Sequence, residues 1–172
     1  MQIKTRRLVL LALFTAIALT IFVLESLVPP PLPIPGVKLG LANVITLILL
    51  CCAKPSDALT VLLLRITLGS IFTGQMVSFS YSLAGGLFCF LVMWALLKLL
   101  NHRFIPLVSI FGALAHNLGQ ILIAILMTST PGIIAYLPIL MFSGTATGLF
   151  TGLCAQVANH YVKKIFSSSL CP

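Results

Sequence analysis

The sequence predicts an all-α integral membrane protein, a bundle of six transmembrane helices with both termini in the cytoplasm. Of its 172 residues, 60% are hydrophobic and only 7% are charged, and the mean hydropathy is +1.20. A soluble domain has about a quarter of its residues charged, so this chain could not present a wetted surface. We therefore treat residues 1–172 as a single transmembrane domain.

Polar and proline-rich stretches separate the apolar segments and set the limits of the expected helices. A helix rises 1.5 Å per residue, so about 20 apolar residues cross about 30 Å of hydrocarbon. The first segment follows Arg6 and Arg7 and has no small-residue cleavage site before the prolines, so we keep it as a span rather than a signal peptide. The expected spans are about 7–28, 39–53, 57–73, 79–100, 105–129 and 133–164, of which the second is short.

The connections between the spans carry their own signals. Five of the ten prolines lie between the first two spans, where they favour an extended path and exclude a helix. This linker is either a stiff cap over a site in the membrane or a rigid connector. Ser56 or Asp57 can cap the third span, and residues 74–80 are expected to form a loop.

Small residues indicate close helix packing on the first and last spans. Gly144, Gly148 and Gly152 recur every fourth residue and predict a smooth stripe for packing against another helix. Ala12 and Ala16 form a shorter pair of the same kind, which could also arise by chance because alanine is common in such helices.

Basic residues set the expected orientation. Six spans place both termini on one side of the membrane, and Lys38 is the one basic residue expected on the other side. The positive-inside rule then places the termini in the cytoplasm, and it explains the net charge of +8 without a nucleic-acid partner. The basic residues on the terminal side are Lys4, Arg6, Arg7, Lys54, Lys98, Arg103, Lys163 and Lys164.

Arg65 remains in the middle of the third span. An unpaired arginine there costs at least about 2.5 kcal/mol, so it should face the bundle interior and meet an anion. Asp57 lies about two turns away on the same helix, which leaves Glu25 or a bound ligand as the partner. Both alternatives stay open at this stage.

The fifth span carries the densest polar cluster. His116 and Gln120 share a helix face and Asn117 lies about 100° round from His116, so together they could line a pocket. Alternatively, they form hydrogen bonds between helices. Asn43 and Gln75 fall in the same outward half of the membrane as Glu25 and Lys38. The candidate substrate-binding residues are therefore Glu25, Lys38, Asn43, Arg65, Gln75, His116, Asn117 and Gln120.

Signatures of catalysis and metal binding are missing from the sequence. It contains no Gly-rich phosphate loop, no nucleophile elbow and no His-Glu-x-x-His motif. Its five cysteines form no metal-binding pattern, and its two acidic residues cannot supply the paired carboxylates that hold Mg²⁺ on a diphosphate. We expect no catalytic residues, no metal and no cofactor.

Several motifs resemble one membrane family. They are Leu24-Glu25-Ser26-Leu27-Val28 with the proline-rich stretch up to Asn43, Leu64-Arg65-Ile66, Ser82-Leu83-Ala84-Gly85-Gly86, and Gly112-Ala113-Leu114-Ala115-His116-Asn117-Leu118-Gly119-Gln120. This pattern resembles the heptaprenyl diphosphate synthase component I family, also called the Gx transporter family. That family is similar to the substrate-binding S components of energy-coupling factor transporters.

The resemblance implies a bacterial plasma-membrane protein that captures a small solute and docks onto a transmembrane coupling protein and its ATPase subunits. It implies that Ala12 and Ala16 contact the coupling protein and that residues 29–38 form a lid. We expect the solute to be anionic, because Arg65, Lys38 and His116 are three possible positive centres, whereas Glu25 is the one acidic residue in the outward half. The family name implies the alternative, a noncatalytic membrane subunit of a polyprenyl diphosphate synthase.

Overall fold

The computed structural model describes residues 2–27, 38–74, 76–100 and 104–166. Within these ranges the regular structure is all helical, which confirms the predicted fold class. The α-helices are α1 (Gln2–Leu27), α2 (Asn43–Cys52), α3 (Pro55–Thr73), α4 (Met76–Leu100), α5 (Ile105–Thr128) and α6 (Leu137–Phe166), with a 3₁₀ helix, η1 (Pro131–Tyr136), before α6.

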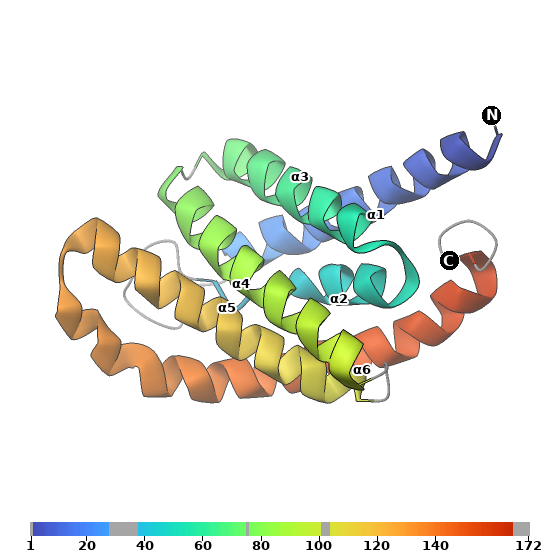
Figure 1. The fold of residues 1–172 in the computed structure, drawn as a ribbon. Helices are drawn as coiled ribbons and strands as arrows, with labels where there is room; N and C mark the ends of the chain where they lie inside the picture. Colours follow the sequence, from blue (N-terminus) through green and yellow to red (C-terminus); the bar gives the residue numbers. More distant parts are fainter. Residues whose placement is uncertain (1, 28–37, 75, 101–103, 167–172) are drawn as a thin grey trace.

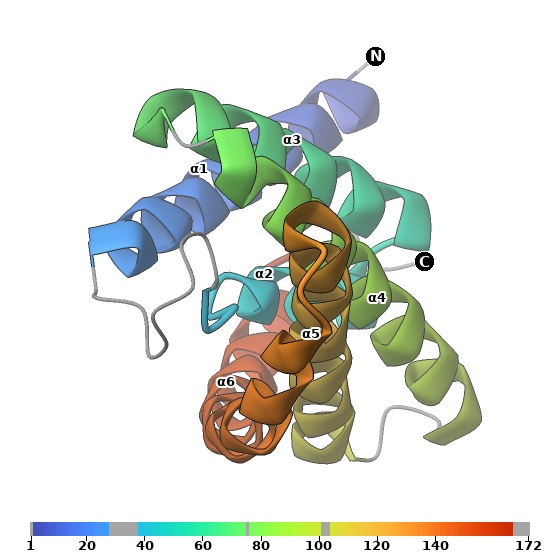
Figure 2. The ribbon, with the colours of Figure 1, turned by 90° about the vertical axis from the view of Figure 1, so that its left-hand side faces the viewer.

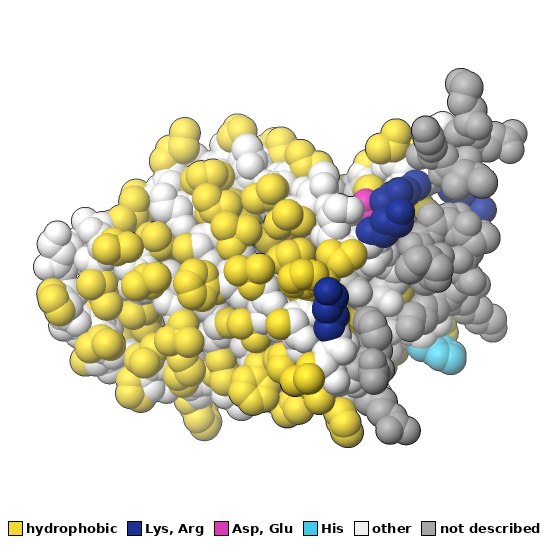
Figure 3. Space-filling model, viewed as in Figure 1, with side chains coloured by type: hydrophobic (Ala, Val, Ile, Leu, Met, Phe, Trp, Pro, Cys, Tyr) yellow, Lys and Arg dark blue, Asp and Glu magenta, His cyan; other side chains and the backbone are white. Residues whose placement is uncertain are grey.

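Within the described residues, five stretches are long and apolar enough to cross a membrane. They are Thr5–Leu27, Pro55–Thr73, Met76–Leu100, Ile105–Thr128 and Pro131–Val162. Large apolar side chains cover the visible face of the molecule, as expected of a surface in contact with lipid (Figure 3). The chain is therefore a multi-pass membrane protein.

The helix α2 differs from the expected span 39–53. It has ten residues and a length of about 15 Å, half the thickness of the hydrocarbon core. Gly40 has a left-handed backbone with φ of +78°, which a continuing helix cannot accept. The residues up to Ala42 form a turn, and the amide of Asn43 donates to the carbonyl of Gly40 at 3.0 Å.

The turn before α4 is shorter than the expected loop 74–80. The helix α3 ends at Gly74, whose φ of +65° provides the left-handed cap, and α4 begins at Met76. At the other end of α3, neither Ser56 nor Asp57 caps the helix through its side chain, which corrects that expectation. Asp57 is instead bound by Arg7 of α1.

The short helix α2 lies in the middle of the bundle, and each of the other five helices contacts it (Figure 2). Eight of its ten residues are buried. The other helices follow one another around α2, with α1 against α3, α3 against α4, α4 against α5 and α5 against α6. The shortest α-helix of the described residues thus lies inside the bundle, away from lipid.

One end of the bundle carries both the start of α1 and the end of α6 (Figure 1). Lys and Arg side chains gather at this end on the visible face (Figure 3). Here Arg7 binds Asp57 through Nε at 3.1 Å from Oδ2 and through Nη2 at 2.5 Å from Oδ1. This ion pair joins α1 to α3 at what we call the basic end.

Candidate functional site

A cavity lies between the middle of the bundle and the end opposite the basic end. Its free volume is about 10 Å³, room for about one water molecule. We call it the polar cavity. It is lined by Phe22 and Glu25 of α1, Lys38 and Gly40 before α2, Arg65 of α3, Ser82 of α4 and His116 of α5.

Four of the predicted site residues, Glu25, Lys38, Arg65 and His116, therefore meet around one space. Arg65 is 3% exposed, and its Nη2 donates to Oδ1 of Asn43 at 3.1 Å, which brings in a fifth. The Nε of Arg65 has no hydrogen-bond partner in the described part of the chain. A side chain this deep in a bundle is expected to use all of its donors.

Glu25 does not form a direct ion pair with Arg65. Among the described side chains, the one ion pair within 4.0 Å is that between Arg7 and Asp57. The Oε1 of Glu25 instead accepts a hydrogen bond from the amide of Gly40 at 2.5 Å. This bond links the segment before α2 to the end of α1. The alternative in which Arg65 has a structural role requires a salt bridge to Glu25, and the described side chains do not form it.

The ring of Phe22 lies close to both cations of the polar cavity. The Nζ of Lys38 lies 3.5 Å from the centre of the Phe22 ring, and the Cζ of Arg65 lies 5.9 Å from it. Such contacts over an aromatic face are attractive, and more so away from water. Burial lowers the pKa of Lys38, Glu25 raises it and Arg65 lowers it, and together they bring this pKa to about 8.

Two glycines allow the imidazole of His116 to reach the polar cavity. A Cβ on Gly40 would lie 2.9 Å from Cδ2 of His116, and one on Gly85 would lie 2.7 Å from its Nδ1. Gly40 is therefore required twice, by this close approach and by its positive φ. Neither ring nitrogen of His116 makes a hydrogen bond of good geometry among the described residues, although the ring interacts with the backbone of Gly85.

Further unpartnered polar atoms surround His116. Gln120, one turn along the same face of α5, is fully buried and has no partner for either its amide nitrogen or its oxygen. The Nδ2 of Asn43 and the Nζ of Lys38 are likewise buried without a partner in the described part of the chain. An unmade hydrogen bond of this kind costs about 1–3 kcal/mol per group.

Other predicted residues lie elsewhere. Asn117 donates through Nδ2 to the carbonyl of Leu140 at 2.6 Å, so it joins α5 to α6, which favours the alternative of a hydrogen bond between helices. Gln75 and the proline-rich residues 28–37 lie outside the described residues. Ala12 and Ala16 are exposed on α1.

The glycine stripe of α6 faces α5. A Cβ on Gly144 would lie 2.5 Å from Nδ2 of Asn117, one on Gly148 would lie 2.7 Å from Cα of Ile110, and one on Gly152 would lie 2.6 Å from Cα of Pro106. Each glycine thus allows a contact that a larger residue would prevent.

Sequence reasoning missed Phe22, Gly40 and Ser82 as lining residues. Phe22 lies three residues before Glu25, so the two share a face of α1, and this spacing was the available signal. Gly40 and Ser82 belong to the motifs that carry the family resemblance. The described residues contain no group of three or more His, Cys, Asp or Glu side chains that could hold a metal ion.

A family model described as heptaprenyl diphosphate synthase component I matches residues 14–158, more than four-fifths of the chain. The chain belongs to the heptaprenyl diphosphate synthase component I family. No curated protein and no solved structure matches it. Every residue that lines the polar cavity falls inside the matched range. Ala16 also falls inside this range, whereas Ala12 precedes it.

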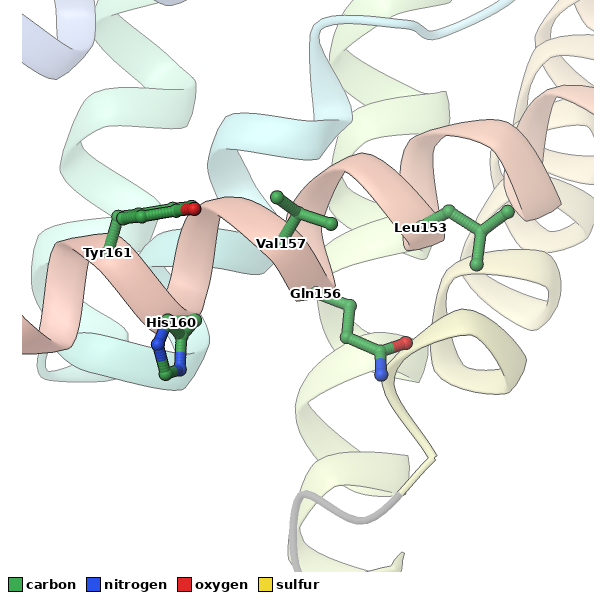
Figure 4. Close-up of a pocket in the computed structure, with 5 residues that line it drawn as sticks. All are labelled: Leu153, Gln156, Val157, His160 and Tyr161. Atoms are coloured by element: carbon green, nitrogen blue, oxygen red, sulfur yellow. The ribbon is translucent and has the colours of Figure 1, made fainter.

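A second pocket lies on the outer surface of α6 (Figure 4). Its lining comes from this one helix: Leu153, Gln156, Val157, His160 and Tyr161. All five side chains are exposed, and none of them is a buried polar group without a partner. The polar cavity is therefore the stronger candidate for a specific site.

Proposed function

We propose that this chain is the substrate-binding subunit, of the S-component kind, of an energy-coupling factor type transporter that takes up a small anionic solute. One observation carries the proposal: in the described part of the chain, most of the buried polar groups without hydrogen-bond partners lie at or next to a single cavity. Such groups are rare in folded proteins, and together they favour a site that a ligand completes.

The unpartnered groups are mostly donors. Lys38 Nζ, Arg65 Nε, Asn43 Nδ2 and Gln120 Nε2 each have a hydrogen to donate, and His116 donates through one ring nitrogen. Oε1 of Gln120 and the other nitrogen of His116 are acceptors, and the buried hydroxyl of Ser78 can donate or accept. A ligand that satisfies this set is rich in acceptors, as a carboxylate or phosphate is.

The start of α2 adds to the attraction for an anion. Helix N-termini carry a partial positive charge, and α2 begins at Asn43, next to Arg65 and three residues after Gly40 of the polar cavity. Transporters use the ends of interrupted helices in this way at the middle of the membrane. In the proposal, α2 and the residues before it together form the sixth crossing.

The orientation follows from charge. With the basic end in the cytoplasm of a bacterium, the polar cavity lies from the middle of the membrane outward, where a solute arrives. The sequence has no nucleotide-binding loop, so in the proposal the chain is no enzyme, and ATP is hydrolysed by partners. The exposed face of α1 at Ala12 and Ala16 offers the transmembrane coupling protein a close approach.

The test is co-purification and uptake. The tagged chain is expressed with candidate coupling and ATPase subunits, and a stable complex is expected, with loss of uptake of the solute when the gene is deleted. Mass spectrometry of small molecules bound to the purified chain identifies the solute. Absence of both a complex and an uptake defect would contradict the proposal.

The family description favours a second candidate, a noncatalytic membrane subunit of a polyprenyl diphosphate synthase. With two acidic residues in the chain, that role is restricted to recruiting a soluble catalytic partner to lipid. A prenyl-transfer assay separates the two candidates. This second role requires that the rate or product length of the soluble synthase change when the chain is added.

A further inference from the structure

We infer that the polar cavity takes a group with a single negative charge, a carboxylate, and not a phosphate monoester or a diphosphate. This inference rests on the proposed function and defines the chemical class of its solute.

Three full charges line the polar cavity. Lys38 and Arg65 are positive and Glu25 is negative, which gives a net charge of +1. Burial disfavours the charged form of Glu25, but its Oε1 accepts a hydrogen bond from the amide of Gly40 and two cations share the cavity, and on this geometry we take it as a carboxylate. His116 adds no full charge above pH 7, where a histidine with ordinary basicity is mostly neutral.

No other residue can change this balance from within the bundle core. Asp57 is the second of the two acidic residues of the chain, and it is paired with Arg7 at the basic end. The side chains of Lys54 and Lys98 are exposed. The net charge of the polar cavity is therefore fixed by Lys38, Arg65 and Glu25.

A single negative charge neutralises the polar cavity when it binds. A group of charge −2 or −3 would leave one or two negative charges buried without compensation, which is strongly unfavourable at low dielectric. The charge balance therefore favours a carboxylate.

The experiment compares anions that differ in charge but not in shape. Methanesulfonate and sulfate are both tetrahedral, with charges of −1 and −2; acetate and pyrophosphate add a carboxylate and a diphosphate. The full chain, purified in detergent at pH 7.5 and constant ionic strength, is heated with each anion while the fluorescence of its single tryptophan is followed. The shift in Tm is compared with that of Arg65→Gln, or of Lys38→Gln if Arg65→Gln does not fold.

The expected result is a shift of about 3–6 °C with methanesulfonate and acetate at ten times their Kd, and no such shift in the variant. Sulfate and pyrophosphate are expected to act equally on wild type and variant, through general salt effects. Glu25→Gln raises the cavity charge to +2 and should make sulfate stabilise the protein. Asp57→Asn makes the same chemical change at the basic end and should leave the wild-type preference unchanged.

A larger variant-sensitive shift with sulfate or pyrophosphate than with methanesulfonate in the wild type would overturn the inference and leave the proposed transporter role standing. Failure of Glu25→Gln to gain a sulfate response would overturn it as well. If no anion gives a shift that depends on Arg65 or Lys38, the anionic solute of the proposed function is wrong too.

Discussion

Arg65 is 3% exposed and donates a side-chain hydrogen bond to Asn43, yet part of its guanidinium is left without a partner in the described part of the chain. In the proposed function, an anion that completes these hydrogen bonds offsets the cost of burying that charge. The same residue is therefore expected to govern affinity more than folding, provided that its charge is retained.

Substitution Arg65→Lys tests this expectation. Lysine keeps the charge but loses the planar fork, so binding of the anionic solute should weaken by about 1–3 kcal/mol, the range for a charge-assisted hydrogen bond. The protein should still insert and fold, as measured by thermal unfolding beside the binding titration. Arg7→Lys is the matched control, since it makes the same change in the ion pair at the basic end and should not alter affinity.

A purely structural Arg65 would behave differently. Arg65→Ala and Glu25→Ala would each destabilise the bundle, and the double variant would recover part of the loss. Lost stability with unchanged affinity would contradict the role of Arg65 as an anion-binding residue. The bond from Gly40 to Glu25 indicates instead that Glu25→Ala acts by loosening the segment before α2.

Lys38 makes anion binding depend on pH. Burial lowers its pKa from 10.5 to about 8, and an anion beside it would favour the ammonium form and raise the pKa again. Binding above pH 8 must then take up a proton. Affinity is expected to fall as pH rises from 8 toward 10, by up to about tenfold per unit, in calorimetric titrations.

Lys38→Arg, which stays charged over this range, should flatten the pH profile, and a flat wild-type profile would contradict the assignment.

The pH dependence has the opposite sign for the stability of the free protein. Between pH 8 and 10.5 the folded chain binds fewer protons at Lys38 than the unfolded chain does, so stability should rise with pH in this window.

The charged part of the site could be predicted from sequence because ionisable residues are costly in lipid and must face a partner. This reasoning identifies Arg65, Glu25 and Lys38 directly. Phe22 escapes it, since an aromatic residue in an apolar helix is ordinary and only its spacing from Glu25 connects it to the site. Asn117 was a candidate because it is polar, but its side chain donates a hydrogen bond to Leu140. Polarity alone does not distinguish a residue that lines a cavity from one that joins two helices.

At the scale of elements, contact between α5 and α6 depends on glycine. Gly148→Ala would place a Cβ 2.7 Å from the Cα of Ile110 and 3.1 Å from the carbonyl oxygen of Ser109, and backbone atoms cannot turn aside. We expect a loss of about 1–3 kcal/mol in stability, measured by thermal or denaturant unfolding. Gly132→Ala is the control, because nothing lies within 4 Å of its added Cβ. Equal stability of the two variants would refute the packing argument.

The outer face of α1 allows the partner contact to be tested separately from folding. Ala16 is exposed, so Ala16→Leu should change stability by less than about 0.5 kcal/mol. It should nevertheless prevent close approach of the coupling protein and abolish co-purification, with solute affinity unchanged. Ala146→Leu makes the same change on an exposed position of α6 and should leave the complex intact. Retention of the complex by Ala16→Leu would remove this face from the proposed interface.

The long helices could be predicted from sequence because their length and apolar composition are direct requirements of the bilayer. The start of α2 could not. Leu39, Leu41 and Ala42 are as apolar as the helix that follows, and hydropathy does not register the left-handed backbone of Gly40. The length of the turn before α4 was missed for a similar reason, since polar residues at the start of α4 can be helical.

For the whole molecule, the basic end predicts the orientation in the membrane. Green fluorescent protein fused to either terminus should fluoresce, because both termini are expected in the cytoplasm. In a cysteine-free background, Thr130→Cys at the far end should react with a membrane-impermeant thiol reagent added to intact cells, and Lys54→Cys should not. The reverse labelling pattern would invert the proposed direction of solute capture.

The central position of α2 also has a consequence for the order of synthesis on the ribosome. Four of the five helices that surround it follow it in the chain. The thiol of Cys52 donates to Oδ1 of Asn159 in α6 at 2.6 Å, across 107 residues of sequence. A nascent chain that stops before α6 therefore leaves one side of α2 uncovered in the bilayer, so closure of the bundle around α2 must wait until translation has produced the last helix.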